Sequence, residues 1–357
     1  MQHDRRRPYR ALAAAAAAAA ALLLAAAQAN STPAAAGTGP ASPAPAAGDI
    51  TLPPAHAGFD YQIGGPYAPP EGVGVVSRDA QATGLTRVVG LCHSVHWTMH
   101  GLAELVGVPY EDVTYRAAGV NHQAWVLEFR HGGTDLYPRL DALIERDPQL
   151  RRRTRVDMYR RLGYYPTETS EHSAEYVPWY LHHDGEIARL RLPVDAYLDI
   201  VAENVAEYES TRDALAAGRA LEAEGTMEYA RQIIHSIVTG TPRTVYGNVP
   251  NRGLIDNLPS EGVVEVPCLV DGSGVPPTRN GPLPAQLAAL NRTYLSTTDL
   301  VVHAALEDAP VRVRQAAMTD PATAAALPPE RIWELCDAMV EAHGDRLQPG
   351  LRKLLGS

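Results

Sequence analysis

Hydrophobic positions along this chain repeat with two different periods, which predict strands and helices in succession. Compact or alternating apolar runs predict strands, namely LTRVVGL (85–91), VTYRAAGV (113–120), AWVLEFR (124–130), RTVYGNV (243–249) and GVVEVPCLVD (262–271). Apolar residues at helical spacing predict helices over 95–105, 135–148, 194–218, 228–240, 283–307 and 329–344. This order of elements predicts a fold of the α/β to α+β class with a helix-rich C-terminal part.

The first 49 residues differ in composition and are not expected to join this fold. A basic start, an alanine–leucine run and the small-residue motif AQA at 27–29 are typical of a secretory signal peptide over 1–29. A wrongly assigned start in a GC-rich gene would yield similar residues, and this alternative stays open. Residues 30–49 are rich in Pro, Ala, Gly and Ser and predict a disordered linker.

Composition narrows the classes of function. The 357 residues are 45% hydrophobic and 20% charged, as expected of a globular protein. A net charge of −10 gives no general electrostatic basis for binding nucleic acid. Three cysteines, Cys92, Cys268 and Cys336, are odd in number and irregular in spacing, which argues against a disulfide framework or a CxxC zinc site. We expect Cys268 and Cys336 to be ordinary buried thiols.

The first candidate for chemistry is the group Cys92, His93, Asn121 and His122. Cys92 follows a predicted strand at the turn into a helix, and such a strand end is where ligands bind in open α/β sheets. A thiolate and an imidazole can share a divalent transition metal, and two protein ligands leave positions open for substrate oxygens. Packing or capping roles for the same residues remain the alternative.

Two further segments are rich in polar groups. GYYPTETSEHSAEYVPWY (163–180) combines tyrosines with Glu168, His172 and Trp179, which suits a sugar site but also a solvated helix with an aromatic stripe. Residues 246–271 are dense in Asn, Asp, Gly and Pro, which favours turns and also fits binding loops.

Taken together, several segments resemble family 4 of the glycoside hydrolases, in its α-galactosidase/α-glucosidase-like branch. They are GLCHSV (90–95), AGVNHQAW (118–125), DLYPRL (135–140), GYYPTETSEHSAEYVPW (163–179), YGNVPNRGLIDNLP (246–259), VEVPCLVD (264–271) and GPLPAQLAALNR (281–292). The resemblance implies an architecture like that of lactate and malate dehydrogenases. A truncated Rossmann-like sheet, the remnant of an NAD-binding domain at 50–92, would precede a helix-rich catalytic and metal domain at 93–357.

The resemblance also implies a reaction and the residues that perform it. Family members hydrolyse O-glycosyl bonds with NAD⁺ and Mn²⁺ as cofactors, through oxidation of the sugar at C3, loss of the C2 proton and elimination. Matched onto this sequence, the metal ligands are Cys92 and His122. The catalytic residues are Tyr176, as the base, and His93. Asn121 and His172 are the substrate-binding residues.

The chain departs from the family pattern at its NAD site. No GxGxxG occurs, EGVGVV (71–76) has only GxG, and the stretch that carries the family's NP motif is missing. Residues that bind NAD therefore stay unknown. The favoured function is α-galactosidase-like hydrolysis, with a non-catalytic sugar- or metal-binding remnant as the alternative. The resemblance further implies an α-galactoside or related oligosaccharide as substrate, a homo-oligomer and a cytoplasmic location, or export if the signal segment is real.

Overall fold

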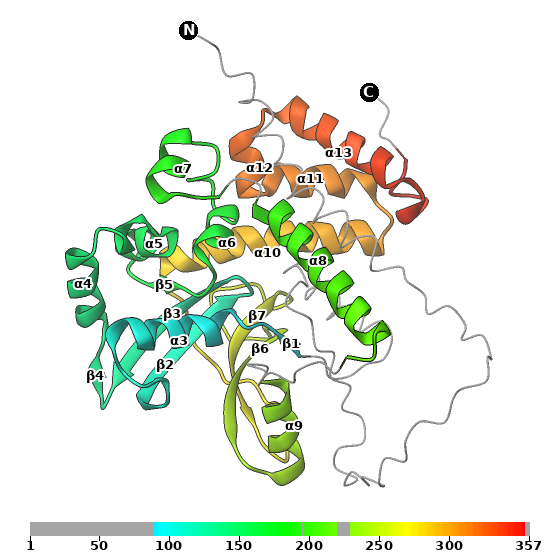
Figure 1. Cartoon of the computed structure of the whole chain (residues 1–357). Helices are drawn as coiled ribbons and strands as arrows, with labels where there is room; N and C mark the ends of the chain where they lie inside the picture. The colour runs from blue at the N-terminus through cyan, green and yellow to red at the C-terminus, as the bar shows by residue number, and fades with distance from the viewer. Residues whose placement is uncertain (1–88, 194–195, 220–228, 354–357) are drawn as a thin grey trace, which may run out of the picture.

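A computed structural model of the chain describes residues 89–193, 196–219 and 229–353 (Figure 1). Its strands are β1 (Gly90–Leu91), β2 (Val113–Val120), β3 (Gln123–His131), β4 (Thr134–Asp135), β5 (Tyr165–Pro166), β6 (Arg243–Pro250) and β7 (Val263–Val270). Its helices are α3 (Ser94–Val106), α4 (Tyr137–Arg146), α5 (Thr154–Leu162), α6 (Ser170–Glu175), α7 (Asp184–Leu190), α8 (Ala196–Ala216), α9 (Ala230–Thr239), α10 (Ala285–Leu306), α11 (Pro310–Thr319), α12 (Pro321–Ala326) and α13 (Pro329–His343). The predicted signal segment, the linker and nearly all of the predicted NAD-domain remnant lie outside the described residues.

The strands form one sheet in which every described pairing is antiparallel, and their order across the sheet differs from their order in the chain. Their order is β1-β6-β7-β2-β3-β4, and β5 pairs with β3. Paired residues form a row across the sheet, from Gly90 through Asn248, Glu265 and Gly119 to Ala124. The Rossmann-like portion that the sequence predicted falls mainly before residue 89 and so lies outside the described residues.

A close backbone approach shapes the β2–β3 hairpin. A side chain at Gly119 would place its Cβ 2.5 Å from the carbonyl oxygen of Gln123 and 2.6 Å from the Cα of Ala124. Those atoms belong to the backbone and cannot rotate away, so this position requires glycine. The hairpin is thereby fixed next to its turn, at residues 121–122.

Helices cover both faces of the sheet (Figure 1). On one face, α3 and α4 bury apolar residues against β2 and β3, in a core that includes Met99, Phe129 and Leu140. The other core joins β6 and β7 to α9 and to Tyr294 and Leu295 of α10. Beyond the sheet, α10, α11 and α13 pack together around their own apolar cluster, at the upper right of Figure 1. The sheet is thus fixed from both sides, which positions the loops at its strand ends.

The structure confirms the fold class and most of the elements predicted from periodicity. Within the C-terminal helical region, prolines begin α11, α12 and α13, because proline suits the first turn of a helix and disfavours continuation of a preceding one. Apolar side chains of α8, such as Leu198 and Tyr208, are exposed. Among the helices described, none combines the length and the hydrophobicity needed to cross a membrane.

Candidate metal centre

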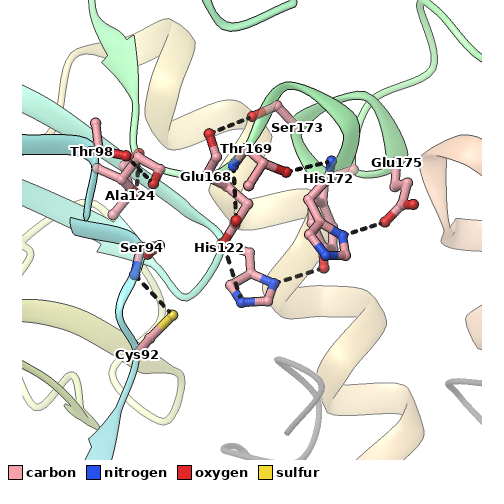
Figure 2. A network of polar contacts seen from close by, with 12 residues as sticks. Cys92, Ser94, Thr98, His122, Ala124, Glu168, Thr169, His172, Ser173 and Glu175 are labelled. Atoms are coloured by element: carbon pink, nitrogen blue, oxygen red, sulfur yellow. Dashed lines mark hydrogen bonds and ion pairs between the residues drawn. The ribbon is translucent and has the colours of Figure 1, made fainter. Parts of the chain in front are cut away.

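Three segments distant in sequence meet at one end of the sheet. Cys92 follows β1, His122 lies in the turn between β2 and β3, and Glu168 comes two residues after β5. The thiol sulfur, an imidazole nitrogen and a carboxylate oxygen of these residues all lie within 4.8 Å of one another. Figure 2 shows the Cys92 thiol beside the His122 imidazole, with Glu168 joined by a dashed line to a nitrogen of that ring.

The turn that carries His122 has an unusual backbone. Val120 pairs with Gln123, so Asn121 and His122 alone form a two-residue connection. His122 has a φ of 62°, in the left-handed region that a non-glycine residue rarely adopts. Such conformations persist where surrounding contacts hold them, and they gather at functional sites. Here the left-handed residue is itself the candidate ligand.

Contacts on both ring nitrogens orient the His122 imidazole. Its Nε2 lies 3.3 Å from Oε2 of Glu168, and its Nδ1 is hydrogen-bonded to the Tyr176 hydroxyl at 3.0 Å. The other oxygen of Glu168, Oε1, accepts a bond from the backbone N–H of Thr169 at 2.8 Å. Glu168 is therefore held by one oxygen and directs the second toward the cluster (Figure 2).

Buried hydrogen bonds anchor the hairpin turn to the helices behind it. The side-chain amide of Gln123 donates to the backbone carbonyl oxygen of Tyr176 at 3.1 Å. The amide of Asn291, on α10, donates to the carbonyl oxygen of Gln123 at 2.8 Å. Gln123 and Asn291 are both buried, and buried bonds of this kind stabilise a local geometry because breaking them leaves polar groups without partners.

Cys92 is fixed from two other directions. The hydroxyl of Tyr229 donates to the Cys92 carbonyl oxygen at 2.6 Å, and the backbone N–H of Ser94 donates to the Cys92 sulfur at 3.4 Å. Burial raises the pKa of the Cys92 thiol, although the bonds from Ser94 oppose the shift. The thiol is consequently protonated at neutral pH in the metal-free protein, and a bound cation favours its thiolate.

Two further ionisable groups surround the cluster. Burial holds the pKa of Glu265 well above its ordinary value, and electrostatic interactions with Cys92 and Glu168 act in the same direction. His172 has a raised pKa because its Nδ1 is bonded to Glu175 at 2.7 Å, and its ring centroid lies 5.6 Å from that of His122. The cluster therefore has the buried carboxyl of Glu265 on one side and the imidazole of His172, bonded to Glu175, on another.

The residues present fit a divalent cation. A thiolate, an imidazole and a carboxylate about 2.0–2.3 Å from one ion would lie at mutual distances like those found here. Carboxylate and imidazole are common ligands of Mn²⁺-class ions, while the thiolate shifts the preference toward softer metals such as zinc. Asn121 is buried beside the cluster with its carbonyl oxygen lacking a partner among the described residues, which leaves an acceptor for a bound molecule.

The structure brings most of the sequence-predicted residues to this place. Cys92 and His122 share the cluster, and Tyr176 is bonded to His122. Asn121 and His172 flank it. His93 is the N-cap of α3, next to Cys92, and its ring meets that of Tyr229 edge-on at 5.3 Å between centroids. The roles of these residues stay predictions.

Sequence reasoning missed two carboxylates. Glu168 was visible within a polar segment, but its meeting with Cys92 depends on the β3–β5 pairing, which no local pattern reveals. Glu265 carried a signal that could have been used. It is a single charged residue in the apolar strand VVEVPCLV, and an acidic residue is rarely buried without a functional partner. Cys268 and Cys336 are buried thiols as predicted.

The sequence of this chain matches the model of the family 4 glycosyl hydrolase C-terminal domain over residues 117–323. The chain belongs to family 4 of the glycosyl hydrolases. It is 39% identical over 265 residues to an α-galactosidase of Bacillus subtilis, an alignment that covers 73% of this chain and 61% of the relative. It is 32% identical to an α-galactosidase of Rhizobium meliloti, over 72% of this chain and 56% of that protein. The chain thus spans about three fifths of the length of these relatives.

Solved structures confirm the fold. A candidate glucosidase of Bacillus subtilis matches with a TM-score of 0.70 at 21% identity, over 79% of this chain and 69% of the other. A 6-phospho-α-glucosidase from gut microorganisms, solved with NAD and Mn²⁺, matches with a TM-score of 0.62 at 18% identity, over 77% of this chain and 66% of the other. At these identities the likeness establishes a shared family 4 fold.

Proposed function

We propose that this chain forms the cation- and sugar-binding part of an α-galactosidase-like hydrolase, which acts on O-glycosyl bonds with Mn²⁺ and NAD⁺ as cofactors. The observation that carries the proposal is the meeting of Cys92, His122 and Glu168 within 4.8 Å, beside Tyr176. Relatives named α-galactosidase support the substrate class, and a family 4 structure solved with NAD and Mn²⁺ supports the cofactors.

The proposed ligands are Cys92, His122 through Nε2, and Glu168 through Oε2. When bound, the cation supplies Lewis acidity toward sugar oxygens, and NAD⁺ supplies a hydride acceptor. We propose that Asn121 accepts a hydrogen bond from a sugar hydroxyl on its side-chain carbonyl oxygen, which has no partner among the described residues. We propose that His172, whose pKa is raised, donates a hydrogen bond to the substrate.

The tautomer of His122 links the cation site to the proposed base. If Nε2 faces the cation, Nδ1 carries the proton. This N–H then donates a hydrogen bond to the Tyr176 hydroxyl oxygen, 3.0 Å away. A hydrogen bond donated to that oxygen favours the phenolate, because it stabilises the charged form. Tyr176 is therefore suited to accept the proton at C2 of the sugar, and His93 is proposed to assist at the substrate.

A second candidate function is sugar or metal binding without hydrolysis. It is favoured by the missing GxGxxG, because no residues between 89 and 353 can be assigned to the dinucleotide. The division into domains at residue 92, the homo-oligomer and the cytoplasmic location also stay predictions.

The deciding experiment measures Mn²⁺ binding and hydrolysis on the same full-length protein. Calorimetric titration with Mn²⁺, in the presence of a reductant, is compared for the wild type, Cys92→Ser and Cys336→Ser. Cys336 lies in the C-terminal helical core, so its variant is a matched thiol control. Hydrolysis of p-nitrophenyl α-galactoside is then followed with and without Mn²⁺ and NAD⁺.

We expect Cys92→Ser to lose Mn²⁺ binding and Cys336→Ser to keep it. Hydrolysis that requires both cofactors would establish the hydrolase. Mn²⁺ binding with a sugar-dependent shift in affinity, but no hydrolysis, would favour the binding-only function. Equal binding by wild type and Cys92→Ser, or no binding by folded wild type, would refute the proposed cation site.

A further inference from the structure

Glu265 is the one charged side chain among the largest fully buried side chains of the described residues, and it lies beside the candidate metal centre. Its exposure is 0%, and neither carboxylate oxygen has a hydrogen-bond partner among the described residues. An isolated buried carboxyl is strongly unfavourable, because it loses the water that solvated it and gains no replacement. Such a residue persists in a fold where another function requires it.

The sheet register shows where the carboxyl lies. Glu265 pairs with Asn248 on one side and with Gly119 on the other, and Asn248 pairs with Gly90. Directly paired residues project from the same face of a sheet. Each glycine precedes a site residue by two or three positions, since Cys92 follows Gly90 and the 121–122 turn follows Gly119. One neighbour of the buried carboxyl, Gly119, thus has no side chain, and a second glycine, Gly90, lies one strand further on, beyond Asn248.

Charge links Glu265 to the same group. Its carboxyl interacts electrostatically with Cys92, His122 and Glu168. The side-chain carbonyl oxygens of its row neighbour Asn248 and of Asn121 are also buried and have no hydrogen-bond partner in the part of the chain that the structure describes. Buried acceptors with no donor therefore gather around the cluster, and a cation with its bound waters supplies what they lack, namely positive charge and hydrogen-bond donors.

We propose that Glu265 is a positioning residue of the cation site, which strengthens Mn²⁺ binding through the negative charge that its carboxyl carries when the cation is bound and through water bound to the ion. It acts from behind the ligands Cys92, His122 and Glu168 and is not itself one of them, since their tight cluster does not include it. This inference rests on the proposed cation site. It also assigns a reason for keeping an unfavourable group in the core, where an apolar residue would be more stable.

The test uses two variants of the full chain that remove the charge in different ways. Glu265→Gln keeps the shape and the polarity, and Glu265→Met replaces the buried carboxyl with an apolar chain of similar length. Glu261→Gln is the matched control, because Glu261 is exposed on the connection just before β7, the strand that carries Glu265. Mn²⁺ affinity is measured by calorimetry with a reductant, and the thermal midpoint is measured in EDTA.

We expect both Glu265 variants to bind Mn²⁺ about 10–100-fold more weakly, the range typical of groups that support metal ligands from behind. We expect Glu265→Met to raise the thermal midpoint of the metal-free protein, because an unpartnered buried carboxyl is gone. A merely structural role predicts the opposite, a lower midpoint. Glu261→Gln should match the wild type in both measurements.

The outcomes separate this inference from the proposed function. Wild-type affinity in Glu265→Met, together with loss of binding in Cys92→Ser, would overturn the role of Glu265 alone. Undiminished binding in Cys92→Ser would overturn the cation site itself. If Glu265→Gln fails to fold, Glu265→Met decides, because it introduces no unsatisfied polar group. A Glu265→Met protein with a lower midpoint and unchanged affinity would also overturn the inference.

Discussion

The left-handed backbone at His122 makes it possible to separate the fold of the turn from its chemistry. His122→Gly and His122→Ala both remove the imidazole, but only alanine keeps a Cβ in a conformation with a φ of 62°. The left-handed region disfavours a residue with a Cβ by about 1–2 kcal/mol. Glycine loses more conformational freedom on folding than alanine does, which offsets about 0.5–1 kcal/mol of that difference. We therefore expect His122→Gly to be the more stable variant by about 0.5–1 kcal/mol.

The assay is a thermal melt of the wild type and both variants, in EDTA and in excess Mn²⁺. For a protein of this size, the glycine variant should melt about 1–4 °C above the alanine variant in EDTA. Mn²⁺ at 100 times its Kd should stabilise the wild type by about 2.7 kcal/mol and should leave both variants nearly unchanged. Alanine melting at or above glycine would refute the backbone argument. A wild-type Mn²⁺ response in either variant would refute the role of His122 as a ligand.

Three further predictions concern stability. The fully buried side chain of Asn251 donates hydrogen bonds to backbone carbonyls and accepts one from a backbone N–H in its loop. Asn251→Ala should therefore lower the free energy of unfolding, measured in urea, by about 3 kcal/mol. A loss below about 1 kcal/mol would contradict this. Burial raises the pKa of Asp157, but bonds from Arg161 and Arg189 outweigh it and lower the pKa overall. Asp157→Asn should therefore be less stable than the wild type at neutral pH by about 1 kcal/mol. In thermal melts this difference in stability should shrink as the pH falls below 3.8, because the wild-type carboxylate then becomes protonated. A difference that does not depend on pH would count against the ion pairs. Gly119→Ala should lose more than about 3 kcal/mol and Mn²⁺ binding together, because its Cβ meets backbone atoms at 2.5 Å; calorimetry showing normal binding would contradict this.

Much of the fold followed from local patterns, while the site did not. Periodicity predicted β2, β3, β6, β7 and the long helices because each carries its own repeat of apolar positions. The meeting of Cys92 with His122 came from the family resemblance, since the spacing of these residues alone is weak evidence and favoured packed or capping roles. Their proximity depends on pairings such as Gly90 with Asn248, across 158 positions of sequence, and no local pattern encodes those.

The carboxylates show a second limit of sequence reasoning. Glu168 lies among several acidic residues, and only the folded loop distinguishes it from Glu171 and Glu175, which are not part of the cluster. The bond between His122 and Tyr176 links residues 54 positions apart and gives the proposed base a physical environment that a motif alone could not. Side-chain chemistry was thus visible in the sequence, but its partners were set by tertiary structure.

The shortness of β1 has a consequence for how the protein opens. This strand has only two residues, paired with Asn248 and Gly247, and it stands at one end of the described strand order. Short terminal strands separate from a sheet at a small fraction of the free energy of global unfolding. A cation held by both Cys92 and the β2–β3 turn would tie this strand to the interior of the sheet. Amide hydrogen exchange at Leu91 and Cys92 would then slow in proportion to cation occupancy, so that local opening becomes a measure of metal binding.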